Sequence, residues 1–401
     1  MIPGESSPVS IPHILIAGAG IGGLTAAIAL ARRGFAVTVA EKRTGFGETG
    51  AGIQVTPNAG RVLDALDLRL PLKRAAVTSE RLVVRRWRDG TQLAEMPMSR
   101  GEAETPFRAL RRTDLHTVLL DAARSQPRIR LIVGRGLGDV QQSEDGITAT
   151  LASESGQTET IAALALIGAD GLWSRTRDLT GDKAPPAFTG FEAWRALVPA
   201  PERLPGQVTL HLGTNHHAVH YPVAGGREIN LVLIRAAKEA REGWSRDGEP
   251  GLPAREVAGA APALRKLVTE APKWQVWSLF DRPPAAMAKG RIALLGDAAH
   301  PVLPFLAQGA ALAIEDAAVL ARELAEHLQT GGASAVPAAL KAYAKARQAR
   351  AARVQAASRA NARNYHVGPP WSWGRNLAMK QMGPEGMRSR YDWLYEWRDE
   401  G

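Results

Sequence analysis

The first forty residues alternate between apolar runs and a helix-forming run. Residues 14–17 read Ile-Leu-Ile-Ala, a short apolar run typical of a buried parallel strand. Residues 24–31 place Leu, Ala and Ile at helical spacing, and residues 36–40 form a second apolar run. The pattern predicts a strand, a helix and a strand, which is how a Rossmann-like α/β domain begins.

Two later apolar runs each end in a glycine and an aspartate. Residues 164–168 lead into Asp170, and residues 291–296 lead into Asp297. A long amphipathic helix is predicted from Gly309 to about residue 328. Carboxylates at the carboxyl ends of parallel strands lie where α/β sheets bind ligands. Gly309 and Ala310, both small, would allow a flat ring to approach the helix start.

The middle of the chain has a different pattern. Between residues 184 and 281 the apolar runs shorten and turns separate them, which predicts an antiparallel sheet. The strand-like runs are residues 193–198, 208–212, 217–223 and 229–234. The predicted divisions are a first α/β part (11–183), the inserted sheet (184–281), a second α/β part (282–330) and a C-terminal helical region (331–401).

Composition narrows the class of protein. The 401 residues are 45% hydrophobic and 22% charged, as in ordinary globular proteins. The sequence contains no cysteine, which excludes disulfides and thiolate metal sites and favours a reducing cytoplasm. No run reaches the ~18 apolar residues of a membrane span, and residues 1–13 lack a signal-peptide pattern. We therefore expect no membrane association.

The net charge of +10 raises nucleic acid as a partner. The basic residues are scattered, and they are densest in residues 341–363, where they alternate with alanine. This pattern favours the solvated face of a helix over a nucleic-acid arm, and attraction of small anionic substrates is a third interpretation. We expect no nucleic-acid partner. A monomer and a homodimer both stay open.

The turn after the first strand carries a GxGxxG motif. Gly18 allows the tight turn, Gly20 lets the backbone approach a pyrophosphate, and Gly23 allows close helix packing. Glu41 follows the second strand, where an acidic residue accepts hydrogen bonds from ribose hydroxyls. The strand–turn–helix–strand context favours a dinucleotide site over a glycine-rich packing turn.

With these motifs in place, the chain resembles the single-component flavin aromatic hydroxylases, which include 4-hydroxybenzoate and salicylate hydroxylases. The resemblance rests on the order of the GxGxxG, Asp170-Gly171 and Gly296-Asp297 motifs and runs from about residue 11 to 330. Motifs at residues 50–58, 112–116 and 307–317 resemble one branch of the family in particular. That branch holds salicylate hydroxylase, 3-hydroxybenzoate 6-hydroxylase and 6-hydroxynicotinate 3-monooxygenase.

The resemblance implies FAD as the bound cofactor. The expected FAD-contacting residues are Gly18, Gly20, Gly23, Glu41, Lys42, Arg43, Arg112, Asp170, Asp297, Gly309 and Ala310. Arg112, two residues before Asp114, resembles the family arginine that reaches the FAD phosphate or ribityl region. The alternative is an ordinary charge at a helix start, because Arg111 beside it is equally basic.

A histidine and a tyrosine are the candidate catalytic residues. In this family branch a His and a Tyr at the spacing of His217 and Tyr221 line the aromatic pocket. A histidine of near-neutral pKa can take a phenol proton, and a tyrosine can hold or relay it. The alternative for His217 is a packing role, and His211, His216 and His220 are not expected to be catalytic. No acidic residue accompanies them at ligand spacing, so no metal site is expected.

Three further residues are expected in the substrate pocket, namely Gln54, Pro304 and Phe305. Phe305 departs from the 6-hydroxynicotinate enzymes, which resemble this chain but carry a histidine in that loop. The departure weakens that substrate assignment and suggests a more apolar pocket wall.

The resemblance implies a monooxygenase that uses NADH or NADPH and O2 to hydroxylate a phenol or aromatic acid through a flavin hydroperoxide. The alternatives are a flavoprotein hydroxylase or epoxidase acting on a non-phenolic substrate, and a non-catalytic binding protein that keeps the FAD fold. The sequence leaves open the substrate, the site of hydroxylation, the loss of a carboxylate and the choice of nicotinamide.

Overall fold

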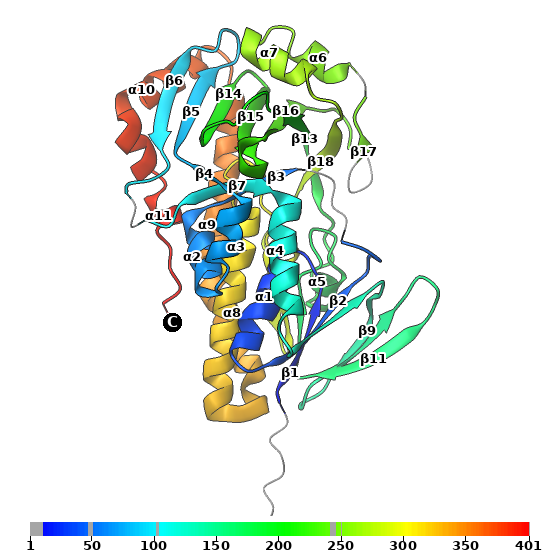
Figure 1. The fold of residues 1–401 in the computed structure, drawn as a ribbon. Coiled ribbons are helices and arrows are strands. Elements are labelled where there is room, and N and C mark those ends of the chain that lie inside the picture. Colours follow the sequence, from blue (N-terminus) through cyan, green and yellow to red (C-terminus); the bar gives the residue numbers. More distant parts are fainter. Residues whose placement is uncertain (1–10, 47–50, 102–103, 241–245, 250, 401) are drawn as a thin grey trace, which may run out of the picture.

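A computed structural model describes residues 11–46, 51–101, 104–240, 246–249 and 251–400 (Figure 1). Gly50, the first residue of one family motif, lies outside these ranges. The two apolar runs at the start form strands β1 (His13–Ala17) and β2 (Ala36–Glu41), which pair in parallel. The α/β start predicted from the sequence is therefore confirmed.

A six-stranded sheet forms the lower half of the molecule in Figure 1. Its order is β19-β20-β12-β1-β2-β8, and only β19 runs antiparallel to its neighbour. The remaining strands are β8 (Ile129–Val133), β12 (Ala165–Gly168), β19 (Ala288–Lys289) and β20 (Ile292–Leu294). The parallel order places the ends of β1, β12 and β20 side by side, so their Gly and Asp turns meet at one edge.

Both faces of this sheet are covered, and β1 supplies side chains to each. Ile14 and Ile16 pack in the core cluster that also includes residues of the helices, whereas Leu15 and Ala17 pack against a small second sheet. The helices are α1 (Ile21–Arg32), α4 (Arg112–Arg124) and α8 (Gly309–Gly331). The small sheet consists of β9 (Gly136–Gln142), β10 (Ile147–Ala152) and β11 (Thr158–Ala163). Burial on two faces explains the continuous apolar run.

An eight-stranded sheet, which we call the roof sheet, forms the upper half (Figure 1). Its order is β17-β18-β13-β16-β15-β14-β5-β6. The strands are β5 (Arg81–Arg86), β6 (Gln92–Pro97), β13 (Ala187–Pro199), β14 (Gln207–Leu212), β15 (His216–Val223), β16 (Glu228–Ala236), β17 (Arg246–Asp247) and β18 (Gln275–Asp281). All four strand-like runs noted in the sequence fall within β13 to β16.

The roof sheet differs from the expected antiparallel insert in one respect. Strands β5 and β6 come from residues 81–97, and β5 pairs with β14 in parallel. Parallel partners need a long crossover, so no local sequence signal announces this pair. Helices α6 (Leu252–Glu256) and α7 (Pro262–Thr269) cover the outer face, as Figure 1 shows at the top.

The remaining elements connect the two halves. A three-stranded sheet contains β3 (Gly52–Val55), β7 (Phe107–Arg111) and β4 (Val77–Ser79). The other helices are α2 (Pro57–Ala65), α3 (Arg69–Ala75), α5 (Arg175–Leu179), α9 (Val336–His366), α10 (Trp371–Ser389) and α11 (Asp392–Tyr395). Short 3₁₀ turns are η1 (Ala224–Gly226), η2 (Gly296–Ala298) and η3 (Gly332–Ala335). Helix α9 lies along α8 and reaches up to the roof sheet (Figure 1).

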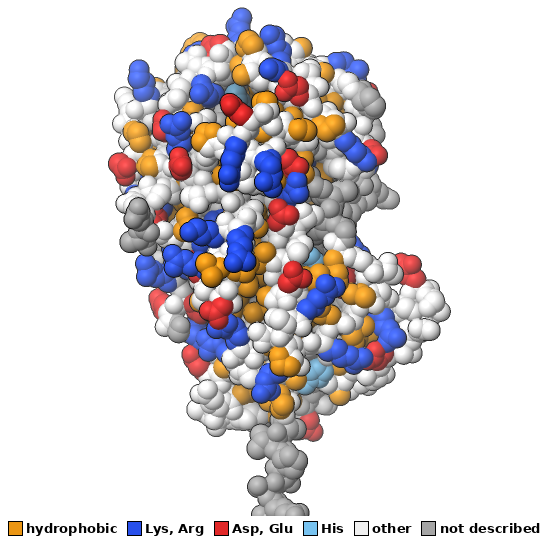
Figure 2. All heavy atoms as spheres, viewed as in Figure 1, with side chains coloured by type: hydrophobic (Ala, Val, Ile, Leu, Met, Phe, Trp, Pro, Cys, Tyr) orange, Lys and Arg blue, Asp and Glu red, His pale blue; other side chains and the backbone are white. Residues whose placement is uncertain are grey.

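The basic stretch of α9 is only partly the solvated face that the sequence suggested. Lys341, Lys345 and Arg353 are exposed, but Arg347 is buried and paired with Glu315 and Asp316. The reason is that α9 packs against α8 on this side. Elsewhere Lys and Arg side chains are interspersed with Asp and Glu on the face that Figure 2 shows. Among the described helices, none has the length and hydropathy needed to cross a bilayer.

Candidate active site

The glycine turn after β1 is held by close packing at two of its three glycines. Gly18 has φ +106°, and a Cβ there would lie 2.4 Å from the carbonyl oxygen of Ala169. A Cβ on Gly23 would lie 1.9 Å from the carbonyl oxygen of Gly18. Both distances are below any real contact, so these two positions require glycine for the turn itself.

Gly20 differs, because a Cβ there would meet no atom within 4 Å. Gly20 is the N-cap of α1, and no side chain caps that helix end. The first N–H groups of α1 therefore have no side-chain cap, and the positive end of the helix dipole lies behind them. An open cradle of this kind fits the pyrophosphate of a dinucleotide.

The Glu41 carboxylate is fixed beside this turn. One oxygen accepts the N–H of Ala19 at 3.0 Å, and the other accepts the N–H of Arg43 at 3.0 Å. Each oxygen keeps a further lone pair, which suits ribose hydroxyl donors. Lys42 and Arg43 are exposed next to it, at the end of β2.

Asp297 lies at the end of β20, in the turn between buried Gly296 and Ala298. Its side chain is exposed to solvent. Burial by surrounding protein nevertheless raises the pKa of Asp297, and the charges of Arg112 and His300 oppose that shift. Asp297 thus reaches solvent while densely packed protein surrounds it. Gly309, the first residue of α8, borders the same place, since its Cβ would lie 3.8 Å from Asp297 Oδ1. Ala310 follows it, half-buried.

The two neighbouring arginines at the start of α4 have different surroundings. Arg111 donates to Glu228 through Nε at 2.8 Å and through a terminal nitrogen. Arg112 instead acts on Asp297 and Arg195, because its charge contributes to lowering the pKa of each. Arg112 therefore lies near both Asp297 and Arg195.

The Asp170 carboxylate is used within its own loop. It accepts hydrogen bonds from Ser174 Oγ at 2.5 Å and from the N–H and Oγ1 of Thr176, both at 3.1 Å. These bonds shape the start of the short helix α5 beside the glycine turn. Asp170 therefore supports the loop that contacts Gly18, and its backbone is the part nearest the turn.

His217 and Tyr221 share the inner face of the roof sheet, as alternation along β15 predicts. His220 points to the other face, where its ring stacks on His211 at 5.5 Å. Val219, between His217 and Tyr221, packs in the cluster that contains Phe305. The candidate residues thus face the loop that follows the Gly296-Asp297 turn, and Pro304 in that loop is half-buried beside Phe305.

The environment of Tyr221 keeps its hydroxyl protonated. The side chain is buried, and burial raises the pKa of Tyr221 above its usual value. A hydrogen bond with Gln54 of β3 and the charge of Arg195 oppose the shift without cancelling it. Gln54, expected in the pocket, is therefore a direct partner of Tyr221.

His217 is buried, with 2% of its surface exposed. Its Nδ1 lies 2.8 Å from Nε2 of His366, the last residue of α9. Burial lowers the pKa of His217 well below its usual value, and the nearby His366 and His216 lower it further. The ring of Phe305 lies 5.5 Å from the His217 ring. His217 is thus a neutral imidazole at physiological pH.

Arg195 is a site residue that the sequence analysis did not single out. Arg195 lies on β13 opposite Val232 of β16, and Val232 lies opposite Val219 of β15. Paired residues point to the same face, so Arg195 shares the inner face with Val219 and Tyr221. Its Nε is buried and has no hydrogen-bond partner, and its guanidinium lies 5.0 Å from the Trp277 ring. Burial lowers the pKa of Arg195. The alternation of β13 was the only signal in the sequence.

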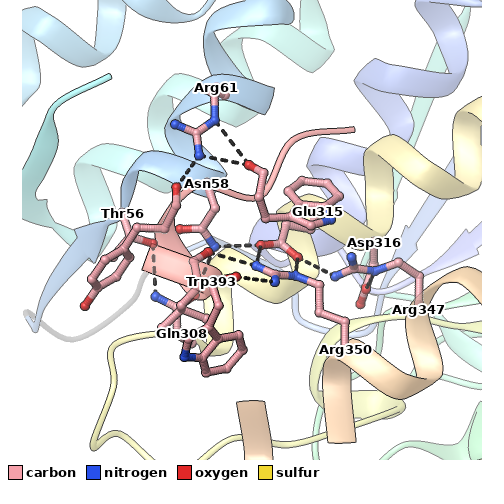
Figure 3. A network of polar contacts seen from close by, with 12 residues as sticks. Thr56, Asn58, Arg61, Gln308, Glu315, Asp316, Arg347, Arg350 and Trp393 are labelled. Atoms are coloured by element: carbon pink, nitrogen blue, oxygen red, sulfur yellow. Dashed lines mark hydrogen bonds and ion pairs between the residues drawn. The ribbon is translucent and has the colours of Figure 1, made fainter. Parts of the chain in front are cut away.

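A buried polar network holds the start of α8 in place (Figure 3). Asn58 of α2 donates to Gln308 at 3.0 Å and to Glu315 at 2.6 Å. Arg347 and Arg350 of α9 also bind Glu315, both at 2.6 Å. The network therefore joins α2, α8 and α9 behind Gly309. Within the described ranges, no three His, Asp or Glu side chains come close enough to hold a metal ion.

Comparison with known proteins extends this picture. A family model described as an FAD binding domain matches residues 12–358. The chain is 34% identical over 404 residues to the 3-hydroxybenzoate 6-hydroxylase of Polaromonas naphthalenivorans, with 98% of each chain covered. It is 36% identical over 401 residues to 3-hydroxybenzoate 6-hydroxylase 1 of Aquipseudomonas alcaligenes, covering 96% of this chain and 97% of that one. A solved salicylate hydroxylase substrate complex matches with a TM-score of 0.80 and 25% identity, covering 98% of this chain and 97% of the other.

Proposed function

The chain belongs to the FAD binding domain family, and we propose that it is a monooxygenase that uses NADH or NADPH and O2 to hydroxylate an aromatic acid bearing a phenol. One observation carries the proposal. The charge of Arg112 acts both on Asp297 in the cofactor cleft and on Arg195 in the roof sheet. Arg112 is therefore near both Asp297 and Arg195, which supports a single site between the end of β20 and the inner face of the roof sheet.

The residues around this site fit FAD. Gly20 and the first turn of α1 would hold the pyrophosphate, Glu41 the ribose, and Asp297 with Arg112 the ribityl chain and nearby phosphate. Gly309 and Ala310 at the start of α8 leave room for the flat ring. When bound, FAD accepts a hydride from the nicotinamide and activates O2. The protein supplies position and water exclusion.

The inner face of the roof sheet supplies the substrate contacts. Arg195, with its unsatisfied buried Nε, is suited to the carboxylate or phenolate of an aromatic acid. Tyr221, which stays protonated beside Gln54, can donate a hydrogen bond to the same substrate. Phe305 provides an apolar wall for the ring.

His217 is suited to take the phenol proton. Its imidazole is neutral, and Nδ1 is engaged by His366, which leaves Nε2 as the nitrogen able to accept a proton. Removing the phenol proton makes the aromatic ring a better nucleophile. General bases of this kind contribute about 10²–10⁴-fold to rate.

Two features support the remaining parts of the proposal. The GxGxxG spacing occurs at residues 18–23 and again at residues 45–50, but only the first lies between a strand and a helix, because β3 follows the second. A single such strand–turn–helix motif suits a single-component enzyme that receives NADH or NADPH transiently. The absence of cysteine supports a reducing compartment such as the cytoplasm.

The test is a substrate screen on the purified protein. We expect the protein to retain FAD, shown by flavin absorbance after gel filtration, and to oxidise NADH or NADPH faster when an aromatic acid is present. The panel contains 3-hydroxybenzoate, salicylate, 6-hydroxynicotinate and an aromatic without a phenol, and mass spectrometry identifies a product carrying one added oxygen. Turnover of the non-phenolic compound alone would favour the epoxidase alternative. Failure to bind FAD would overturn the proposal.

A further inference from the structure

The C-terminal helix α9 delivers a histidine to the candidate base. His366 is the last residue of α9 and is 7% exposed. It lies 149 residues from His217 in the sequence, yet the two rings share a 2.8 Å contact between Nδ1 of His217 and Nε2 of His366. We propose that His366 is a positioning residue for His217: it holds the His217 ring through Nδ1, so that His217 Nε2 is the nitrogen left to accept the substrate proton. This rests on the proposed function of His217.

His366 is itself held on several sides. Its ring stacks on Phe191 of β13 at 4.6 Å and 28°. The Phe305 ring meets it edge-on at 5.7 Å. Its carbonyl oxygen accepts the N–H of Asn215 at 3.1 Å, which ties the end of α9 to the start of β15. A residue fixed in this way presents Nε2 in one place.

The surroundings of His217 and His366 keep both rings from being protonated to imidazolium before substrate binds. Burial, together with the charges of His216 and Arg375, lowers the pKa of His366 to about 4. Burial also lowers the pKa of His217, with His366 and His216 acting in the same direction. Tyr365, whose ring lies 5.4 Å from His217, stays neutral because burial raises its pKa. Among the described residues whose charges shift these two pKa values, none is acidic.

Two neutral imidazoles share one N–H in the bond between them. When His217 Nδ1 carries that proton, His217 Nε2 has a free lone pair and accepts from the substrate. In the reverse arrangement Nε2 carries the proton and cannot act as a base. A phenol O–H can donate only to the first form, so substrate binding selects it.

The bond also strengthens during proton transfer. The phenol O–H bond breaks, the Nε2–H bond forms, and His217 becomes an imidazolium whose Nδ1–H still points at His366 Nε2. A hydrogen bond from a cation is stronger than one between neutral groups. His366 therefore stabilises the charge on His217 at the moment it appears, as the third member of a catalytic triad does.

The test compares two substitutions of His366 with a matched control in the holoenzyme. His366→Leu removes the acceptor, whereas the side-chain amide of His366→Gln reaches the position of Nε2. His220→Gln is the control, because His220 lies on the same strand but on the outer face. Each variant is first checked for flavin content and for thermal unfolding temperature.

We expect His366→Leu to lower kcat for product formation by about 10–100-fold, with KM changed less than about twofold. His217→Leu should show a similar loss, and the double variant should lose no more than either single one. His366→Gln should recover most of the activity, and His220→Gln should match the unchanged protein. The proposal would be overturned if the loss of kcat in the double variant equalled the product of the two single losses, or if His366→Gln were as slow as His366→Leu.

A spectroscopic measurement separates this proposal from the proposed function. In 15N spectra of labelled histidines, His217→Leu should remove one hydrogen-bonded ring N–H signal, and His366→Leu should remove the same signal. If the unchanged protein shows this shared signal but turns over no aromatic acid, the proposed function is wrong, while the hydrogen bond between His217 and His366 is supported. If no shared signal exists, the pair itself is refuted.

Discussion

Glu228 binds Arg111 through both of its carboxylate oxygens, which separates Arg111 from its neighbour Arg112. Arg111→Ala should therefore weaken the junction between β7 and β16 by about 1 kcal/mol and leave FAD affinity unchanged. Arg112→Ala should weaken FAD binding by about 10–100-fold, because a charged hydrogen bond contributes about 1.5–3 kcal/mol. Flavin fluorescence titration and thermal unfolding of both variants measure the two effects. Equal loss of FAD affinity in both variants would contradict the assignment.

Two glycines of the same motif should respond differently to alanine. Gly20→Ala places a Cβ in open space, so the apoprotein should unfold at its normal temperature while FAD binding is lost or greatly weakened. Gly23→Ala forces a Cβ to within 1.9 Å of the Gly18 carbonyl oxygen and should destabilise the apoprotein. Calorimetry of the apoproteins and FAD titration test the pair. Tight FAD binding by Gly20→Ala would show that the phosphates lie elsewhere.

Arg195 should determine affinity for anionic substrates. Arg195→Leu removes a cation whose buried Nε has no partner, so the protein should be no less stable, while affinity for aromatic acids should fall at least about 10-fold. Affinity for uncharged phenols should fall less. The perturbation of flavin absorbance on ligand binding gives both dissociation constants. Arg195→Lys is the control, because it keeps the positive charge but loses the planar guanidinium that can donate two parallel hydrogen bonds.

Buried histidines make stability depend on pH. Burial lowers the pKa of His211 to about 4, against an unperturbed value near 6.5. The unfolded chain therefore binds a proton at a pH where the folded chain does not. The stabilising contribution is fully present above about pH 6.5 and is lost as the pH falls towards 4, by at most about 3 kcal/mol. In His211→Gln the unfolding temperature should fall less steeply over this range, and an unchanged slope would contradict the explanation.

The network of Figure 3 should be essential for stability. Glu315 is fully buried, and its charge is matched by Arg347 and Arg350. Glu315→Gln removes the carboxylate that pairs with Arg350 and leaves the buried Arg347 with Asp316 alone. Breaking a buried ion pair typically costs about 3–5 kcal/mol. Glu326→Gln, an exposed position on the same helix, should change stability by less than about 0.5 kcal/mol. Thermal unfolding of the two variants gives the comparison.

Local patterns were sufficient to predict the parts of the fold whose signals are local. Hydrophobic spacing, together with the glycines and aspartates at element ends, predicted several elements. These are the glycine turn, β1, β2, the roof strands β13 to β16 and the long helix α8. The inward direction of His217 and Tyr221 followed from alternation alone. The family and its aromatic hydroxylase relatives were also indicated by the motifs.

The rest depended on contacts between distant residues. No local pattern brings His366 to His217, because the two residues lie 149 positions apart and meet only where α9 packs against β15. In the sequence, Arg195 resembles any single charged residue within an apolar strand. Only the packed structure shows that its Nε is buried without a hydrogen-bond partner. Arg347 appeared to lie on a solvated face because its buried partners belong to α8.

The parallel pair of β5 and β14 has a consequence for synthesis of the chain. Residues 81–97 leave the ribosome as a hairpin, but β14 (Gln207–Leu212) follows more than a hundred residues later. Until then, β5 exposes an unpaired edge to other nascent chains. At roughly 5–20 residues per second this interval lasts about 6–22 seconds. The nascent chain is therefore most exposed to aggregation and most in need of chaperones while residues 98–212 are being made.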